Sequence, residues 1–438
     1  MTRAHRPACD APRADTRTPT ATTWHDARRL AHEAGAATAA AHGAEWTEQV
    51  PLAEALGRVA ALDVVARTPL PHFASSAMDG WAVCGPGPWR LRPDAPPADS
   101  PQVLAPGDAV DVVTGSLLPE GCDAVLRSEN GRIRMLDGTH PVLHRAPWCP
   151  ADEPRPGQHM RAAGVEASVG DVLITRGSVL GPVHLAVAAG AGCDTLSARR
   201  RPTVALAFTG DEVVTQGSPL AGQVRDSFGP SLPGIVDALG GEVVTLERVG
   251  DSAGSTTLAL GLNPSSSGGA REPVPAPDVV VTTGGTGASA ADHVRAVLLE
   301  AGAEFVVDGI DVRPGGPAFL ARTPDGRWFV GLPGNPLAAL LTCTTLLHPL
   351  LAGLLERPLA ALREIELGTP IDPARSHTLL RPFTRHPDAA RPGVDLAFPT
   401  PWHGAAMLRG LADADGVLVA PGEGAHAGAL ARYLPLPW

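Results

Sequence analysis

The sequence predicts a multidomain α/β protein, in which an αβα domain with a mixed, mostly parallel sheet is joined to smaller helical and β-rich domains. Three observations support this fold class. The 438 residues exceed what a single hydrophobic core usually serves. Strand-like and helix-like segments alternate over residues 201–356. Short β-like runs, broken by Pro and Gly, fill residues 67–154 and the last part of the chain.

The N-terminal part is predicted to be helical after a disordered tail. Residues 1–20 lack the apolar core of a signal peptide, and we expect them to be disordered. Residues 24–40 are rich in Ala, Arg and Glu, which favour a helix, and Thr22 or Thr23 can cap its start. A second short helix is expected over residues 50–66.

The αβα domain is predicted from four strand candidates that alternate with three helix candidates. Strands are expected at TVALAFTG, EVVTLERVG, DVVVTTGG and WFVGLPG, and helices at SLPGIVDALGG, ADHVRAVLLEAG and PLAALLTCTTLLHPLLAGLLE. This alternation predicts a parallel sheet with helices on both faces. The predicted domains are a tail (1–20), a helical linking domain (21–66 with 155–200), a small β-domain (67–154), the αβα domain (201–356) and a C-terminal β-domain (357–438).

The composition argues against several classes of function. The net charge of −11 and the scarcity of aromatic residues, one Tyr and eight Phe, argue against nucleic-acid binding. The chain has no lysine, so its 35 cationic side chains are all arginine and mechanisms that need a lysine are excluded. The six cysteines never approach CxxC spacing, which argues against structural zinc. No apolar run is expected to reach the roughly 18 residues of a membrane span, so a cytoplasmic protein is expected.

Four predicted loops follow strand-like runs and are unusually rich in Gly, Pro and polar residues. Because ligands of an open parallel sheet bind at the carboxyl ends of its strands, these loops predict a binding site. Each loop also has a plain structural explanation, as a turn, a strand end with a capping Asp, or a rigid Pro-containing turn. Only their joint placement on one sheet edge favours a site. The loops are 209–212 (TGDE), 282–285 (TTGG), 313–317 (RPGGP) and 332–336 (LPGNP).

The TTGG loop and two carboxylates predict a phosphate site with a metal ion. Gly284 and Gly285 allow the backbone to approach an anion closely, and a helix that starts after the turn directs its free N–H groups at that anion. Glu212 and Asp292 are expected on neighbouring loops of the same edge. Magnesium prefers a few carboxylate oxygens together with phosphate and water, so this pair predicts a Mg²⁺ site.

The motifs taken in order resemble one known family, the molybdopterin molybdenumtransferases, also called the MoeA or gephyrin E-domain family. The likeness covers about residues 22–436. It rests on PLPHFASSAMDGWAV, VVTGSLLPEGCDAVLRSE, RRPTVALAFTGDEV, GQVRDS, TTGGTGASAADHV, RPGGP and LPGNP. The resemblance implies four-domain subunits in a homodimer, with a molybdopterin-binding αβα domain, a C-terminal β-barrel-like domain, and a cleft completed by the partner subunit.

The resemblance also implies a reaction, which is the insertion of molybdate into adenylylated molybdopterin with release of AMP. The implied partners are the two small-molecule substrates, a second copy of the chain, other molybdenum cofactor biosynthesis proteins and the apo-molybdoenzymes that receive the product. In physical terms the chemistry is electrostatic. Magnesium neutralises the phosphates, while cations and N–H donors hold molybdate at the reacting end.

The resemblance assigns roles to individual residues. Glu212 and Asp292 correspond to the magnesium ligands, and Thr283, Gly284 and Gly285 to the cradle for the nucleotide phosphates. The expected catalytic residues are Asp292, Asp226, Arg313, and Asp79 of the SAMDG motif, which corresponds to an acidic residue reaching the cleft of its own or the partner subunit. Further expected substrate contacts are Thr209, Gly210, Asp211, Ser227, Ser289, Pro314, Gly315, Pro317, Pro333, Gly334, Asn335 and Pro336.

The sequence departs from the family pattern around the same cleft. The family's usual KPGKP is RPGGP here, so Arg313 keeps a cation but Gly316 does not. Ala338 stands for a serine after the Asn-Pro turn, Phe228 for an asparagine, and Ala74-Ser75 for Asp-Asn. The GVSVGE turn becomes GTGASA over residues 285–290 and loses a carboxylate. The magnesium and nucleotide side is intact, whereas the oxyanion side has lost at least one cation and one hydroxyl.

Two hypotheses follow from these departures. In the first, the chain is a working but divergent molybdenumtransferase in which Arg313 does the job of the missing lysines. In the second, it is a catalytically impaired paralogue that binds adenylylated molybdopterin or a nucleotide as a carrier, dimer partner or regulator. Losing one charge-assisted contact to a dianion typically costs about 1.5–3 kcal/mol, which weakens an enzyme without necessarily abolishing its activity.

Overall fold

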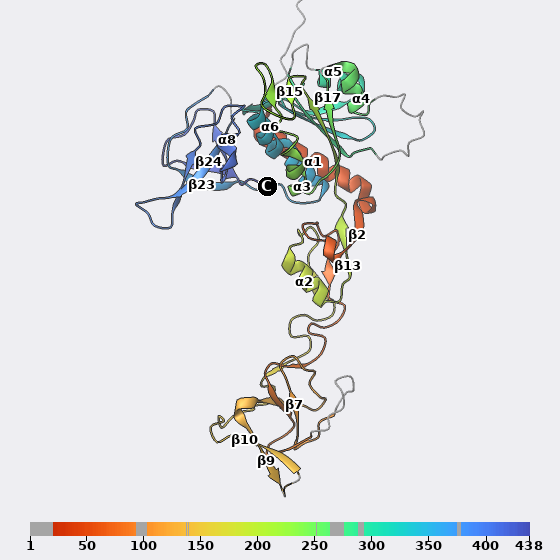
Figure 1. Ribbon diagram of the computed structural model, residues 1–438, viewed down its shortest axis with the longest axis vertical. Helices are drawn as coiled ribbons and strands as arrows, with labels where there is room; N and C mark the ends of the chain where they lie inside the picture. The colour runs from red at the N-terminus through yellow and green to blue at the C-terminus, as the bar shows by residue number, and fades with distance from the viewer. Residues whose placement is uncertain are drawn as a thin grey trace, which may run out of the picture. The chain divides into compact units, whose positions relative to one another are not determined.

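The computed structural model divides the chain into two compact units. Unit 1 consists of Met1–Thr47 with Arg199–Trp438, and unit 2 of Glu48–Ala198. Figure 1 shows the helices and strands of both units. The structure describes residues 21–92, 103–136, 138, 140–250, 252–262, 276–287, 293–374 and 378–438.

The centre of unit 1 is a six-stranded mixed sheet. Strands β17, β14, β18 and β22 are parallel neighbours, β21 is antiparallel to β22, and β19 is antiparallel to β21, so all four predicted strands are confirmed. The strand in the middle is buried at every residue, as expected for a parallel sheet covered on both faces. The order across the sheet is β17 (Glu242–Val249), β14 (Thr203–Thr209), β18 (Val279–Thr283), β22 (Trp328–Leu332), β21 (Phe319–Arg322) and β19 (Glu304–Asp308).

Helices cover both faces of this sheet. One face packs against α1 (Trp24–His42), α3 (Leu232–Ala238) and the continuous helix formed by α6 (Pro336–Thr342), the π-turn Cys343–Leu347 and α7 (His348–Leu354). The other face packs against α4 (Ala253–Ala259) and α5 (His293–Glu300). The predicted three-layer αβα arrangement is therefore confirmed (Figure 1).

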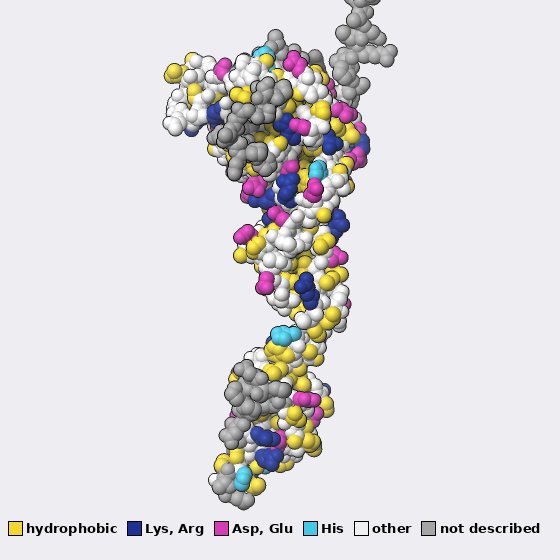
Figure 2. Space-filling model, turned by 90° about the vertical axis from the view of Figure 1, so that its right-hand side faces the viewer, with side chains coloured by type: hydrophobic (Ala, Val, Ile, Leu, Met, Phe, Trp, Pro, Cys, Tyr) yellow, Lys and Arg dark blue, Asp and Glu magenta, His cyan; other side chains and the backbone are white. Residues whose placement is uncertain are grey.

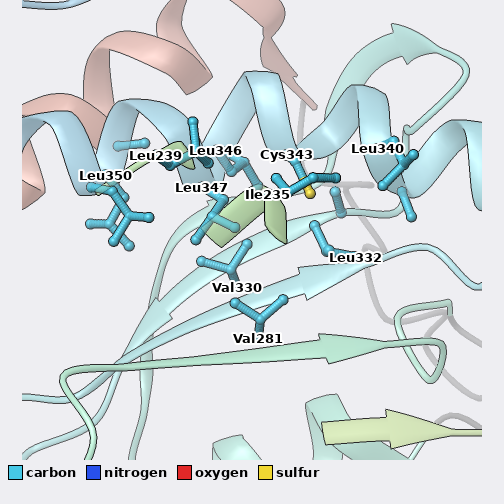
Figure 3. Packing of buried hydrophobic residues seen from close by; sticks show 14 of the residues in the cluster. Ile235, Leu239, Val281, Val330, Leu332, Leu340, Cys343, Leu346, Leu347 and Leu350 are labelled. Carbon is cyan, nitrogen blue, oxygen red and sulfur yellow. The ribbon is translucent and has the colours of Figure 1, made fainter. Parts of the chain in front are cut away.

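The continuous helix over Pro336–Leu354 forms the core of unit 1. Leucines such as Leu346, Leu347 and Leu350 are fully buried and point at strand residues including Val281 and Val330 (Figure 3). Burying each leucine stabilises the fold by about 1.5–3 kcal/mol. By length and by a mean hydropathy of 1.7 this 19-residue helix could cross a membrane, but 94% of its apolar window is buried inside the protein. The expectation that no apolar run reaches membrane-spanning length is therefore wrong. Threonines and one histidine interrupt the apolar run, but the helix continues through them.

The predicted N-terminal helix is confirmed and begins at Trp24. Thr23 caps it by accepting a hydrogen bond from the Asp26 N–H at 3.1 Å. The helix packs tightly on α7, where a Cβ on Gly353 would lie 2.2 Å from the carbonyl oxygen of His32. Although the predicted division grouped this segment with residues 155–200, α1 belongs to unit 1, and the four-domain division stays a prediction.

The C-terminal part of unit 1 forms a second sheet that closes into a five-stranded barrel, as predicted. A pairing between β24 and β26 completes the ring. Two short strands, β20 (Ile310–Arg313) and β1 (Thr22–Thr23), extend it in parallel beside β24. The ring runs through β24 (Thr378–Pro387), β25 (Asp395–Pro399), β23 (Arg363–Leu367), β27 (Leu430–Leu434) and β26 (Gly416–Pro421), and the short helix α8 (Arg409–Ala412) lies next to it in sequence.

Unit 2 contains a six-stranded sheet that is antiparallel except for the pair β6 and β7. Its order is β8 (Ala124–Arg127), β5 (Gly80–Val83), β7 (Asp108–Val112), β6 (Trp89–Leu91), β10 (His140–Arg145) and β9 (Gly131–Leu136). Short ladders and one helix make up the rest: β2 (Thr47–Pro51) with β13 (Thr195–Arg199), β3 (Val64–Val65) with β12 (Val172–Ile174), β4 (Ser75–Ser76) with β11 (Met160–Arg161), and α2 (Pro182–Gly190).

The helix predicted over residues 50–66 is wrong. Only the single 3₁₀ turn Leu52–Glu54 forms there, and β3 follows. Gly57 has φ +76°, which ends any helical run, and Ala60 pairs with Ala198 across an isolated bridge. The apolar spacing fits a helix face, but these residues instead pack on α2 and β12 in a small core of their own.

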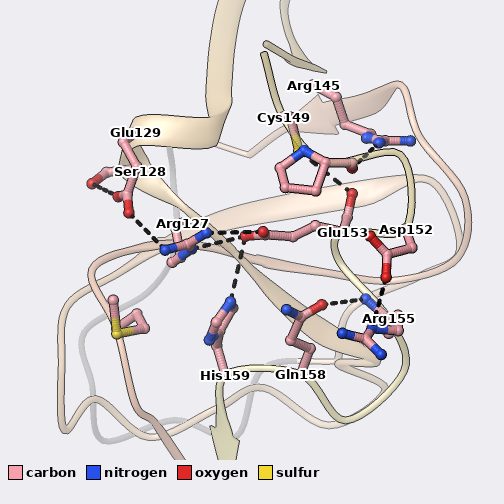
Figure 4. Close-up of polar contacts among 12 residues, drawn as sticks. Arg127, Ser128, Glu129, Arg145, Cys149, Asp152, Glu153, Arg155, Gln158 and His159 are labelled. Atoms are coloured by element: carbon pink, nitrogen blue, oxygen red, sulfur yellow. Dashed lines mark hydrogen bonds and ion pairs between the residues drawn. The ribbon is translucent and has the colours of Figure 1, made fainter. Parts of the chain in front are cut away.

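A buried charge cluster stabilises unit 2. The Arg127 guanidinium donates two hydrogen bonds to the Glu153 carboxylate, at 2.9 and 3.0 Å, and that carboxylate is nearly fully buried (Figure 4). The paired guanidinium outweighs the effect of burial and lowers the pKa of Glu153 to about 2. His159 Nε2 lies 3.4 Å from the same carboxylate without hydrogen-bond alignment. The cluster fixes the loop before β11 to strand β8.

The surface carries both signs of charge. On the face shown in Figure 2, arginine and acidic side chains are interspersed over the described residues of both units, without gathering into a region of one sign. A mixed surface of this kind creates no long-range field that would attract a polyanion to this face.

Candidate functional site

Three of the predicted loops meet at one edge of the αβα sheet. Strands β14, β18 and β22 are parallel neighbours, so their carboxyl ends coincide. The Thr209 hydroxyl donates a 2.7 Å hydrogen bond to the Thr283 carbonyl, which ties the TGDE loop to the TTGG loop. The Gly284 N–H donates a 2.9 Å hydrogen bond to the Leu332 carbonyl, which ties TTGG to LPGNP.

The fourth loop, RPGGP, does not leave this sheet, and that expectation is corrected. The strand before it, β20, pairs with β1 and β24 of the C-terminal sheet. Ile310 and Val312 of this four-residue strand are buried, and its register pairs Val312 with Thr378 of β24 and not with a strand of the αβα sheet. RPGGP therefore faces the LPGNP loop from the barrel side.

The two glycines of TTGG are required by their backbone conformation and by their neighbours. Gly284 has φ +81° and Gly285 has φ +62°, a region that side chains other than glycine rarely adopt. A Cβ on Gly284 would lie 2.5 Å from the Thr209 hydroxyl, and one on Gly285 would lie 2.7 Å from a methyl group of Val294. The turn therefore presents bare backbone at the sheet edge.

A cavity of about 600 Å³, here called cavity A, opens at this edge. It collects most of the residues predicted for the nucleotide side, from the TGDE, TTGG and LPGNP loops and from the segment that contains Asp226 and Ser227. Asp211 does not line it, and lies instead near Gly250 at the end of β17. The predicted residues that line cavity A are Thr209, Gly210, Glu212, Asp226, Ser227, Thr283, Gly284, Gly285, Gly334, Asn335 and Pro336.

The carboxylates in cavity A differ in how they are engaged. Asp226 is nearly buried, with 7% of its side chain exposed, and pairs with the Arg248 guanidinium. Its Oδ1 also accepts hydrogen bonds from the N–H groups of Phe228 and Gly229, each at 3.0 Å. Glu212 is exposed and lies against Gly210, where a Cβ would come within 2.9 Å of Oε2.

The fit of magnesium to this edge can be tested on Glu212 alone. Asp292 and Ser289 lie outside the described residues, so the predicted pair of magnesium ligands, Glu212 and Asp292, stays a prediction. Within the described ranges no group of three His, Cys, Asp or Glu residues forms a closed metal site. One exposed carboxylate beside a phosphate cradle fits magnesium, because this ion usually binds one or two carboxylates and completes its shell with phosphate and water.

A second cavity of about 950 Å³, here called cavity B, lies between the RPGGP and LPGNP loops and the barrel. The departures from the family pattern, Gly316 and Ala338, both line it. Asn335 lines both cavities, so the two adjoin at the LPGNP turn. The predicted residues that line cavity B are Arg313, Pro314, Gly315, Pro317, Pro333 and Asn335.

Cavity B contains a second arginine that the sequence reasoning missed. Arg381 of β24 is only 8% exposed, and its Nη1 donates hydrogen bonds to the carbonyl oxygens of Leu380 and Arg313, at 3.0 and 3.4 Å. Burial and the nearby Arg313 lower the pKa of Arg381, but an arginine still carries its charge at neutral pH. Cavity B therefore contains two arginines, Arg313 and Arg381, despite Gly316. The sequence signal that could have identified Arg381 is an arginine within an apolar strand, between Leu380 and Phe383.

Asp79 belongs to unit 2. Its carboxylate accepts hydrogen bonds from the backbone N–H and the hydroxyl of Thr114, at 2.7 and 2.8 Å, and these bonds lower its pKa. The carboxylate is therefore ionised and held in one orientation. Its role in the site stays a prediction.

The fold and the two cavities define a class of protein. An αβα sheet with a glycine turn at its edge, next to a cavity lined by two arginines, has the features of a protein that binds anionic, nucleotide-like substrates. Two family models match the chain: the MoeA N-terminal region (domains I and II) over residues 23–192, and the probable molybdopterin-binding domain over residues 205–353.

Curated relatives give the family. A molybdopterin molybdenumtransferase from Haemophilus influenzae is 31% identical over 322 residues, covering 70% of this chain and 73% of the relative. One from a Nostoc species is 31% identical over 324 residues, covering 70% and 69%. The chain belongs to the molybdopterin molybdenumtransferase (MoeA) family.

Solved structures agree on the fold. The molybdopterin biosynthesis MoeA protein from Pyrococcus horikoshii superposes with a TM-score of 0.72 at 24% identity, covering 95% of this chain and 99% of that one. A second structure of the protein from that organism gives a TM-score of 0.71 at 20% identity. At these identities the likeness supports the architecture alone.

Proposed function

We propose that this protein is a molybdopterin molybdenumtransferase, which inserts molybdate into adenylylated molybdopterin and releases AMP. The observation that carries the proposal is the junction of cavities A and B at Asn335. Transfer of molybdate to a nucleotide-linked pterin needs both substrates within bonding distance. Two cavities of suitable chemistry that share a wall residue supply that proximity.

The nucleotide end of the substrate is assigned to cavity A. The backbone of Gly284 and Gly285 holds the phosphates, since no side chain obstructs the approach of an anion there. Glu212 would hold magnesium, with Asp292 as the second proposed ligand. The ion, when bound, neutralises phosphate charge and makes AMP a better leaving group.

The molybdate end is assigned to cavity B. Arg313 and Arg381 line it, and their guanidinium groups would hold the dianion by charge-assisted hydrogen bonds. Because Arg381 is buried and tied to two carbonyl oxygens, its position is set before molybdate arrives. The prolines at 317, 333 and 336 stiffen the loops around the junction.

The proposal also covers the oligomeric state, the recipients of the product and the cellular location. A homodimer in which Asp79 of one copy completes the cleft, delivery of the product to apo-molybdoenzymes, and a cytoplasmic location are inferred from the family. Magnesium dependence is likewise proposed, with Glu212 as its supporting residue.

The proposal is tested by the release of AMP. The full chain is mixed with adenylylated molybdopterin and Mg²⁺, with and without molybdate, and AMP is measured by chromatography. Molybdate-dependent AMP above the protein-free control is the expected result. Release that equals the protein-free control, with nucleotide binding retained, would overturn the transferase assignment in favour of a nucleotide carrier.

A further inference from the structure

We propose that Arg248 is a phosphate-binding residue of cavity A and that Asp226 acts by positioning it. This inference rests on the proposed function, because it takes the ligand of cavity A to be a nucleotide. Neither residue 248 nor the end of β17 is part of the four loops that the sequence singled out, and the inference starts from the sheet register.

The register places Arg248 at the same edge as the glycine cradle. Across the sheet, Arg248 is the Cα partner of Phe208, Phe208 that of Thr283, and Thr283 that of Leu332. Two inter-strand spacings therefore separate Arg248 from Thr283, which is about 10 Å between Cα atoms. An extended arginine side chain covers most of that span, so Arg248 can reach a phosphate group held at Gly284.

Arg248 is held in place by two neighbours. Its Nη2 donates to Asp226 Oδ2, and its guanidinium carbon lies 5.6 Å from the centroid of the Phe208 ring. Phe228, a departure from the family pattern, packs on Phe208 with ring centroids 6.3 Å apart. Gly229 leaves room for the ion pair, since a Cβ there would lie 2.3 Å from Asp226 Oδ2.

The ion pair presents its positive member to the cavity. Asp226 is 7% exposed, while Arg248 is 36% exposed, and both line cavity A. Oδ1 of Asp226 is already occupied by two backbone N–H groups, which leaves this carboxylate little capacity for a metal ion or a substrate proton. The guanidinium has five N–H donors in a fixed fork, and donors not used by Asp226 remain for a phosphate oxygen.

A purely structural role would explain the same ion pair as a tie between β17 and the loop after β16 (Val224–Arg225). The two roles differ in what they predict for ligands. A structural tie affects all ligands of cavity A and the stability of the fold alike. A phosphate contact distinguishes AMP from adenosine, which has the same base and ribose but no charge.

The test is a calorimetric titration of the full chain with AMP and, separately, with adenosine. Arg248→Gln is expected to weaken AMP binding about 10- to 100-fold, the loss typical of one charge-assisted contact, with adenosine affinity changed less than about threefold. Arg248→Lys should recover part of the loss, because it keeps the charge without the fork. Asp226→Asn should weaken AMP binding as well, and the double variant should be no weaker than Arg248→Gln alone.

The matched control is Arg327→Gln. Arg327 also makes an ion pair, with Asp325 at 2.8 Å, and lies 5.5 Å from the Phe329 ring centroid, but its side chain is more buried than that of Arg248 and it lines neither cavity. The Arg327→Gln substitution should leave the affinities for AMP and for adenosine unchanged. Equal weakening of AMP and adenosine by Arg248→Gln, unchanged AMP affinity, or additive losses in the double variant would overturn the inference. Arg248-dependent AMP binding without molybdate-dependent turnover would instead overturn only the proposed function.

Discussion

Cavities A and B adjoin at one residue but are built in different ways. Cavity A contains the glycine turn at the ends of parallel strands, where a side chain would collide, beside charged side chains such as Glu212 and Arg248. Cavity B lies between loops of two different sheets, and two arginines line it together with Asp372 and several prolines. The departures Gly316 and Ala338 line cavity B, and the departure Phe228 lines cavity A. Recognition by backbone is fixed by the fold and tolerates few substitutions, whereas recognition by side chains can be redistributed among neighbours.

The largest effect is expected from adding a side chain to the backbone cradle of cavity A. Gly284→Val should reduce AMP affinity by more than about 100-fold, because its Cβ would collide with the Thr209 hydroxyl and its φ would be strained by roughly 1–3 kcal/mol. Titration calorimetry measures the loss. Gly393→Ala is the control, since Gly393 also has positive φ but nothing within 4 Å of its Cβ. Retained AMP binding in Gly284→Val would mean that the cradle does not hold the nucleotide.

The next effect concerns the side-chain cavity. Arg381→Gln should raise the molybdate concentration needed for half-maximal AMP release about 10- to 100-fold, since one of two cations is removed, with AMP affinity unchanged. Arg391→Gln is the matched control, because Arg391 pairs with Glu366 and Asp388 on the surface of the same barrel. A loss of AMP affinity equal to the loss for molybdate would show that the two cavities are not separate recognition sites.

The buried carboxylate of Glu153, which pairs with Arg127, should affect the stability of the fold and not ligand affinity, unlike the arginines of the cavities. Glu153→Gln should lower the free energy of unfolding by about 3 kcal/mol, because it leaves Arg127 without its buried partner, and should not alter nucleotide affinity. Glu129→Gln removes the exposed partner of the same arginine and should cost less than about 1 kcal/mol. Urea denaturation monitors both variants, and equal costs would contradict this distinction.

The pair of Glu153 and Arg127 predicts that the free energy of unfolding depends on pH in the acid range. The pKa of Glu153 in the folded protein, about 2, lies below the ordinary glutamate value of 4.5, so the stabilisation by this carboxylate is complete above pH 4.5 and is lost as the pH falls toward 2. Wild-type unfolding free energy should therefore decrease over this range more steeply than that of Glu153→Gln. Parallel curves for the two proteins would show that this carboxylate is not responsible.

The smallest effect is a gain. Gly316→Lys restores the cation of the family pattern in cavity B, where a Cβ would meet its nearest neighbours only at ordinary contact distances of 3.4 and 3.6 Å. Half-maximal molybdate should fall up to about tenfold, the value of one additional charged contact. Gly316→Met matches the length without the charge and should bring no gain. If both variants behave like the wild type, Arg313 and Arg381 already satisfy the anion.

Much of the architecture was predictable because it depends on local patterns. The helix from Trp24 and the four strands of the αβα domain were predictable from local residue patterns, and the glycine turn from glycines that follow a strand. The failures came from pairing over long distances. Residues 50–66 carry a helix-like spacing but pair with segments more than 100 residues away, and RPGGP joins the barrel through β20. Local sequence contains no signal for the partner that a short strand will select.

The sequence by itself determined the family, the alternation of strands and helices along residues 201–356 and the glycine turn, since each depends on short local motifs. Only the tertiary structure decided which charges face the cavities. Arg381 and Arg248 lie in ordinary-looking strands, and the sheet register and the closure of the barrel bring them to the site. A charge acts over a few ångströms in space, and that distance is set by packing among segments far apart in sequence.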